Sequence, residues 1–278
     1  MLEQIMANEV PIRLGAFFGI LTVMGLWELL SPRRKLTTPK GVRWLNNLGI
    51  VFFNSLVLRL VFPVVAVGAA AAAQQQGWGI LNHVELPVVL EVVLAVVIMD
   101  GVIYLQHVMV HAVPLFWRLH RMHHADLDYD VTTGARFHPL EIILSMGIKL
   151  ATVVLLGPAP VAVLIFEVLL NGTAMFNHGN VRLNAKLDKV LRLFVVTPDM
   201  HRVHHSTIPS EANTNFGFNL PWWDRIFMTY RAQPEAGHEG MTIGISQFRD
   251  KRELWLDKLL LQPFRTDSKE YPIGGKKK

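Results

Sequence analysis

Histidines gather in the stretch from residue 107 to residue 205, where ten of the 12 histidines of this 278-residue chain lie. They form one H-x-x-x-H pair, two H-x-x-H-H triplets and two single residues: His107 and His111; His120, His123 and His124; His201, His204 and His205; His138; and His178. Residues three and four apart share a helix face, so each cluster presents its rings together. Neutral imidazole is a common ligand of iron, zinc and copper. Ten such ligands are too many for one ion, which predicts a site for two metal ions.

The chemistry that these clusters favour is oxygen activation. A pair of redox metals held beside a bilayer could use dioxygen to attack a C–H bond of a lipid, whereas zinc has no redox chemistry. The chain contains no cysteine. This absence excludes disulfides, cysteine-ligated iron–sulfur clusters and thiolate-ligated haem.

Asp100 is a candidate partner for a ligand histidine. It shares one helical stripe with Tyr104, His107 and His111, at spacings of four, seven and eleven residues. An acidic side chain at this depth in an apolar segment is costly unless it is paired. Its carboxylate could accept the second N–H group of a ligand histidine, or it could bond to a neighbouring helix.

Other polar residues close to the histidines in sequence could also orient an imidazole ring: Asp126, Asp128, Asp130, Glu141, Asp199, Asn213 and Asn215. For the three aspartates between residues 126 and 130, the alternative is a solvated loop. The two asparagines are expected to shape a loop over the site, and turn chemistry would explain them equally well. The histidines outside the clusters, His83 and His238, are expected at the surface.

Composition and hydropathy predict a membrane protein. Hydrophobic residues make up 51% of the chain and the mean hydropathy is +0.31, which is too apolar for an ordinary soluble enzyme. Apolar segments long enough to cross or enter a bilayer lie at residues 14–30, 48–73, 86–105, 140–156 and 160–176. The expected fold class is therefore all-α: four to five spanning or re-entrant helices, with a cytoplasmic helical cap that holds the histidine-rich di-metal site.

The distribution of Lys and Arg predicts the orientation. Residues 33–43 contain five of these basic residues and residues 107–139 contain three, whereas residues 74–83 and 157–160 contain none. Lys and Arg in short loops stay on the cytoplasmic side. We therefore expect an inner or plasma membrane protein whose histidine clusters and C-terminus are cytoplasmic. The net charge of +5 is then explained by a membrane surface rather than by nucleic acid.

The chain is expected to form a single membrane-embedded domain over residues 1–278. The motifs lie at about residues 100–230. Residues 240–265 contain leucines interspersed with charged residues, which predicts an amphipathic C-terminal segment. Residues 266–278 are expected to be a basic tail.

The combined motifs resemble the fatty acid hydroxylase superfamily, also called the sterol desaturase family, in its bacterial-type integral membrane form. The resemblance rests on the histidine pattern together with Phe137-His138-Pro139, Asn177-His178, Asn213-Thr214-Asn215-Phe216-Gly217 and Trp223-Asp224-Arg225-Ile226-Phe227. It implies a di-iron enzyme that uses dioxygen to hydroxylate or desaturate a lipid such as a sterol, fatty acyl lipid or ether lipid. It also implies that all ten histidines bind two iron ions, which zinc can replace in purified protein, and that electrons come from a separate protein.

Two other classes of function use histidines in membranes. A metal transporter should hold its ligands near the bilayer midplane on broken helices, whereas these clusters follow the ends of apolar segments. A zinc-dependent membrane hydrolase needs a catalytic glutamate, as in H-E-x-x-H, and the sequence has no such motif. Both are therefore weaker alternatives to a lipid oxidase.

Overall fold

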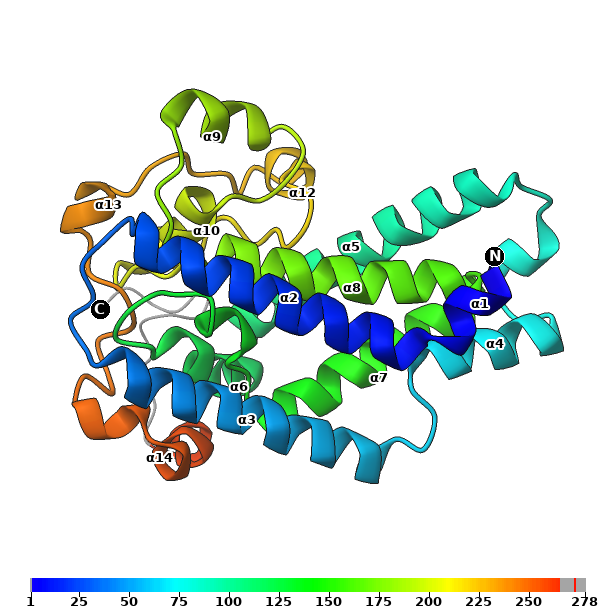
Figure 1. Cartoon of the computed structure of the whole chain (residues 1–278), viewed down its shortest axis with the longest axis horizontal. Coiled ribbons are helices and arrows are strands. Elements are labelled where there is room, and N and C mark those ends of the chain that lie inside the picture. The colour runs from blue at the N-terminus through cyan, green and yellow to red at the C-terminus, as the bar shows by residue number, and fades with distance from the viewer. Residues whose placement is uncertain (1, 266–272, 274–278) are drawn as a thin grey trace.

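The computed structural model describes residues 2–265 and residue 273, and the elements in this part of the chain are helical. Five long helices lie side by side along the molecule (Figure 1): α2 (Glu9–Leu30), α3 (Lys40–Val61), α5 (Val88–Ala112), α7 (Pro139–Leu156) and α8 (Pro160–Asn177). Each belongs to a segment long and apolar enough to cross a membrane. These helices confirm the prediction of an all-α protein with four to five spanning helices.

The outer surface of these helices is strongly apolar. Leu30, Phe52, Leu60, Val89 and Leu155 are each between 70% and 84% exposed. Soluble proteins rarely present such large apolar side chains together over a broad surface. A lipid environment accounts for them, so the fold is that of an integral membrane protein.

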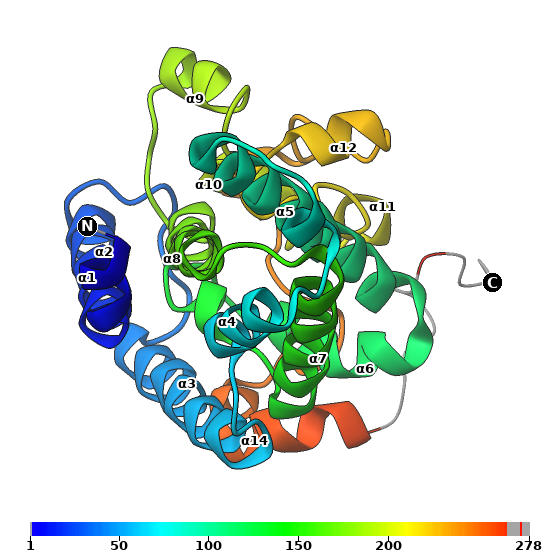
Figure 2. The ribbon, with the colours of Figure 1, turned by 90° about the vertical axis from the view of Figure 1, so that its right-hand side faces the viewer.

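The second apolar segment, predicted at residues 48–73, is not one helix. Helix α3 ends at Val61 and α4 (Ala66–Gln76) begins after a break that contains Pro63, which has no N–H group to donate. Ala66, Ala70 and other small residues of α4 are buried against α7 and α8. Figure 2 shows α4 beside these two helices, so the small side chains allow a close approach.

Two loops without Lys or Arg meet at the end of the bundle that lies far from the histidines. Gly79 and Gly157 have φ angles of +90° and +67°, which favour glycine. A Cβ atom on Gly79 would lie only 2.3 Å from the backbone nitrogen of Gly157. The loops at residues 77–79 and 157–159 therefore pack directly on each other. The short helices α1 (Leu2–Ala7) and η1 (Ile80–His83) lie near this end.

Short helices form a cap at the opposite end (Figure 1). They are α6 (Pro114–His124), η2 (Thr133–Ala135), α9 (Ala185–Leu191), α10 (Pro198–His204), α11 (Pro209–Ala212), α12 (Trp222–Ile226), α13 (Gly237–Gly240), η3 (Lys251–Leu254), α14 (Leu256–Leu261) and η4 (Gln262–Phe264). The predicted amphipathic segment at residues 240–265 is thus broken into separate short helices. Leu259 of α14 packs with Ile50 and Met122, which joins this segment to α3 and α6. The predicted basic tail lies outside the described residues, except for residue 273.

Candidate metal centre

Nine of the ten clustered histidines converge in the cap. They form one group of five, His107, His111, His120, His124 and His204, and one group of four, His123, His178, His201 and His205. Within each group, one ring nitrogen from each residue lies within 4.8 Å of the others, and all nine side chains are buried. The rings come from α5, α6, α10 and the C-terminal end of α8. Convergence from at least three helices is therefore observed, and each group could hold a metal ion.

The Nε2 atoms of these histidines face one another. The Nε2 atom of His107 lies 3.2 Å from that of His120, and the Nε2 atoms of His111 and His124 are 3.1 Å apart. In the second group, the Nε2 atom of His178 lies 3.2 Å from that of His123 and 3.2 Å from that of His205. Each group therefore directs several ring nitrogens toward a common centre.

The Nδ1 atoms of six of these rings have partners that require an N–H donor at Nδ1. They donate as follows: His107 to Phe216 O at 2.7 Å, His111 to Asn213 Oδ1 at 3.2 Å, His120 to Glu141 Oε1 at 2.6 Å, His123 to Arg136 O at 3.2 Å, His178 to Ala174 O at 2.7 Å, and His204 to Thr214 O at 2.8 Å. A neutral imidazole with its proton on Nδ1 has a lone pair on Nε2. The lone pairs of several rings are thus turned toward each other in a buried space, which favours a cation between them.

Burial keeps the rings neutral. It lowers the pKa of His124, His201, His204 and other cap histidines well below the ordinary value, and it lowers the pKa of His178 to about 3. Neighbouring imidazoles add to the effect, because protonation would place positive charges close together. Neutral imidazole is the form that binds metals.

His138 does not join either group. Its Nδ1 atom accepts a hydrogen bond from Leu140 N at 3.2 Å, and its Nε2 atom donates to Leu260 O at 3.3 Å. The residue is the N-cap of α7, whose first turn begins with Pro139. Both ring nitrogens are therefore engaged in helix capping and in the contact with α14, and His138 lies apart from the nine grouped histidines.

A cavity of about 380 Å³ lies next to the histidines. Side chains from α2, α3, α5, α6, α7 and α8 line it, including those of His107 on α5 and His120 on α6. The cavity thus connects the group of five histidines with the interior of the helix bundle.

The part of the chain that contains the histidines is similar to known proteins. Residues 92–229, which span α5 to α12 and contain all ten clustered histidines, match the family model described as fatty acid hydroxylase. This part of the chain is therefore similar to fatty acid hydroxylases. No solved structure matches the chain.

Relatives of the chain are named for the lipids on which they act. The ornithine lipid hydroxylase OlsE of Rhizobium tropici is 28% identical, and the match covers 94% of this chain and 78% of the relative. The alkylglycerol monooxygenases of Homo sapiens and Caenorhabditis elegans are 29% and 26% identical over 52% and 48% of this chain. These matches span only 32% and 26% of the animal proteins. Together with the family match, these relatives support an oxidoreductase that acts on lipids.

Among the residues expected to orient ligands, two contact a clustered histidine directly. The carboxylate of Glu141 accepts from Nδ1 of His120 at 2.6 Å. Asn213 contacts His111, and its Oδ1 atom accepts from Nδ1 of that ring.

The side chain of Asn215 bonds to the backbone instead: its Nδ2 atom donates to Met200 O and Arg231 O at 2.8 and 2.7 Å. It thereby ties α10 to the chain that follows α12.

Asp100 and Asp199 join separate elements of the fold and are not hydrogen-bonded to the clustered rings. The carboxylate of Asp100 accepts from Leu220 N at 3.1 Å and from Trp223 Nε1 at 2.9 Å, so it links α5 to α12. Asp199 pairs with Arg202, and its Oδ2 atom lies 3.2 Å from Nε of Arg33. For Asp100 the helix-contact alternative is the one observed.

The groups that accept the shortest hydrogen bonds from the histidine rings were the hardest to predict from the sequence. Glu141 was one of several acidic candidates, and only its distance of 2.6 Å from Nδ1 of His120 distinguishes it. The carbonyl groups of Thr214 and Phe216 were not predicted, because any residue type supplies a backbone acceptor. The Asn213–Gly217 motif was the only available signal for this segment.

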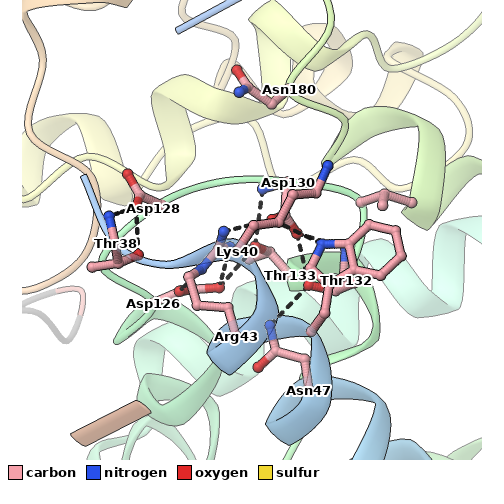
Figure 3. Close-up of polar contacts among 12 residues, drawn as sticks. Thr38, Lys40, Arg43, Asn47, Asp126, Asp128, Asp130, Thr132, Thr133 and Asn180 are labelled. Carbon is pink, nitrogen blue, oxygen red and sulfur yellow. Dashed lines mark hydrogen bonds and ion pairs between the residues drawn. The ribbon is translucent and has the colours of Figure 1, made fainter. Parts of the chain in front are cut away.

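The three aspartates at residues 126–130 are not solvated loop charges, which makes that alternative wrong. Figure 3 shows Arg43 of α3 among them: it donates to both carboxylate oxygens of Asp126 at 2.8 Å and to Asp130 Oδ2 at 2.5 Å. Asp128 accepts from the backbone and side chain of Thr38 at 2.8 and 2.5 Å. All three aspartates are buried. Burial would raise the pKa of Asp126, but Arg43 and Arg136 hold it well below its usual range.

The two remaining histidines have different positions. His83 is exposed, as expected. His238 is buried in the cap, with its Nε2 atom 3.6 Å from Oδ2 of Asp199, so the expectation that it lies at the surface was wrong. Burial lowers the pKa of His238 to about 4.

Proposed function

We propose that the protein is a di-iron membrane enzyme that uses dioxygen to hydroxylate a C–H bond of a lipid. The observation that carries this proposal is the set of buried Nε2 atoms that face one another at 3.1–3.2 Å, while six of the nine rings donate from Nδ1 to other groups. Facing lone pairs in a buried site are unfavourable without a cation. Nine histidines, without His138, would hold the two ions, five on one and four on the other.

Iron fits the donor set and the chemistry of the relatives. Hydroxylation inserts oxygen into a C–H bond, which requires a redox-active metal, and imidazole suits iron as well as zinc. When bound, the iron pair would supply the electron transfer to dioxygen. Zinc could replace iron during purification and would then give an inactive protein.

The residues of the chain supply positioning and shielding. Glu141, Asn213 and the backbone acceptors hold six of the nine rings with Nε2 toward the centre, which is the usual role of outer partners at metal sites. The buried cap excludes water from the group of four. The cavity beside His107 and His120 would admit the lipid from the helix bundle.

The alternatives explain fewer of these features. A transporter would need a path for the ions through the bundle, whereas the clustered histidines lie in and next to the cap. A hydrolase would need a free carboxylate as general base, whereas Glu141 is engaged by His120. The proposed enzyme would require a separate electron-donor protein and no nucleic acid.

The test is replacement of His124 or His204 by Ala. Each change removes a proposed ligand from the group of five, and the apolar helices remain intact, so the protein should still insert but should lose lipid oxidation and metal. The loss of activity should exceed that caused by Glu141→Gln. Glu141 is a hydrogen-bond partner of a proposed ligand, and replacing such a residue typically lowers activity about 10–100-fold. Product formation and iron content are measured in protein supplied with iron, dioxygen and a reductant.

His83→Ala is the matched control, because this histidine is exposed and lies outside both groups. It should retain full activity and metal content. Full activity in His204→Ala with unchanged iron content would refute the assignment of the group of five.

A further inference from the structure

The cavity beside the histidines lies mostly within the apolar helices, but polar side chains form part of its wall. Besides His107 and His120, its walls include Asn54, Gln106 and Glu141 near the histidines. Polar side chains at this depth are costly in a membrane protein and are retained mainly for function. A cavity that accepted only a hydrocarbon chain would be lined by apolar groups.

Three buried acceptor atoms in this lining have no hydrogen-bond partner among the described residues. They are Oδ1 of Asn54, Oε1 of Gln106 and Oε2 of Glu141. The amide of Asn54 is oriented by its Nδ2 atom, which donates to Phe137 O at 2.9 Å, so its oxygen is the free atom. Glu141 uses its other oxygen for His120. An unmade hydrogen bond at a buried acceptor costs about 1–3 kcal/mol, which a ligand with N–H or O–H donors would recover.

At the opposite end of the cavity, the carboxylate group is already paired with basic side chains. Glu167 of α8 accepts from Lys149 Nζ at 2.6 Å and from Arg13, and both partners also line the cavity. Lys149 follows Glu141 by eight residues on α7 (149 − 141), which corresponds to about 12 Å along the helix. The demand for hydrogen-bond donors is therefore confined to the end near the histidines.

Apolar side chains make up much of the rest of the lining. They include Phe17 of α2, Leu58 of α3, Ile142 of α7, and Leu170 and Met175 of α8. Such a lining suits an acyl or alkyl chain. The cavity thus combines unpaired hydrogen-bond acceptors near the histidines with apolar side chains from several helices.

We propose that the substrate is a lipid that binds with a hydrogen-bond-donating headgroup at the histidines and its hydrocarbon chain in the bundle. This inference rests on the proposed function and defines its substrate class. Hydroxyl, amine or amide N–H groups of the headgroup donate to Asn54, Gln106 and Glu141. The oxidised carbon consequently lies in the headgroup or next to it, not in the middle of the chain.

The experiment compares three lipids with chains of equal length. Hexadecylglycerol carries hydroxyl donors, an ornithine-containing lipid carries ammonium and amide donors, and the di-O-methyl ether of hexadecylglycerol carries none. Iron-supplied wild-type protein should oxidise at least one donor-bearing lipid about tenfold or more faster than the methyl ether, as the loss of a hydrogen bond predicts. Fragmentation in the mass spectrometer should place the new oxygen at the headgroup or the adjacent carbon.

Asn54→Leu and Gln106→Leu remove one acceptor each and retain a similar side-chain volume. Each should reduce the preference for donor-bearing lipid over methyl ether by about tenfold. Gln75→Leu is the control, because this glutamine is exposed on α4 and does not line the cavity. Retention of the same lipids by purified protein, measured by native mass spectrometry, provides a readout that is independent of oxidation.

The outcomes separate the two proposals. If no lipid is oxidised, the proposed function fails, and the binding preference alone decides the inference. If wild-type protein binds the methyl ether as well as hexadecylglycerol, or if the oxygen enters the middle of the chain, the headgroup inference is overturned. Equal preference in Asn54→Leu, Gln106→Leu and wild-type protein would also overturn it.

Discussion

His238 illustrates how a residue outside every motif becomes part of the cap. Its ring is buried beside Asp199, a carboxylate that also binds Arg33 and Arg202. Burial disfavours the charged form and lowers the pKa of His238 from 6.5 to about 4. The unfolded chain therefore binds a proton below about pH 6.5 that the folded protein does not bind, and the stability contributed by the neutral ring decreases as the pH falls.

Replacing His238 with Asn should flatten the acid dependence of stability. Between about pH 7 and pH 5, the wild-type protein should lose up to about 2 kcal/mol more than the variant, because Asn does not titrate in this range. The measurement is the thermal unfolding midpoint in mild detergent as a function of pH, with the exposed His83→Asn as a control. Parallel pH profiles for wild-type and His238→Asn protein would contradict the prediction.

At the scale of elements, α3 fixes the segment that follows α6. Arg43 lies in the first turns of α3 and binds Asp126 and Asp130, which come directly after His123 and His124 (Figure 3). A buried charge network of this kind is specific in geometry, because each carboxylate must meet its donor. The N-terminal part of the chain thereby determines where the end of α6 and its rings lie.

Arg43→Met should destabilise the protein strongly. It leaves Asp126 and Asp130 buried without their main cationic partner, and breaking a buried ion pair in this way costs about 3–5 kcal/mol. We expect a lower unfolding midpoint in detergent and reduced metal content, because the end of α6 is no longer held. Arg252→Met is the matched control: its pair with Asp257 is about half exposed and should contribute little. Equal effects of the two changes would show that the Arg43 network has no special role.

At the scale of the whole molecule, the basic and uncharged loops separate to opposite ends. The segment 33–39 and the histidines lie at the cap end, whereas the loops at residues 77–79 and 157–159 meet at the other end (Figure 1). This arrangement agrees with a cytoplasmic cap under the rule that Lys and Arg stay inside. The structure shows that the two kinds of loop lie at opposite ends of the bundle, and the charge distribution predicts which end faces the cytoplasm.

Single cysteines can test this orientation, because the natural chain has none. Lys35→Cys and Lys251→Cys, at exposed cap positions, should react with a membrane-impermeant maleimide only after the cells are opened. Gln75→Cys, which is exposed on α4 near the opposite end, should react in intact cells. The cysteine-free parent shows the background. Labelling of Lys35→Cys in intact cells would reverse the orientation.

The sequence by itself determined the features that depend on local pattern. Ligand type and helical spacing predicted the three histidine clusters, and runs of apolar residues predicted the spanning helices, because both depend on residues close together in the chain. The match over residues 92–229 agrees with the resemblance carried by these motifs.

Only the tertiary structure decided which of these residues meet. His138 became a helix cap, Asp126 became the partner of Arg43, and His120 found Glu141 21 residues later in the chain. The backbone carbonyl groups of Thr214 and Phe216 could not be predicted as ring partners, because every residue type has such a group. Burial and ion pairing arise from contacts between segments that are distant in the chain. The sequence alone therefore does not distinguish an acidic residue in water from one that is buried against an arginine.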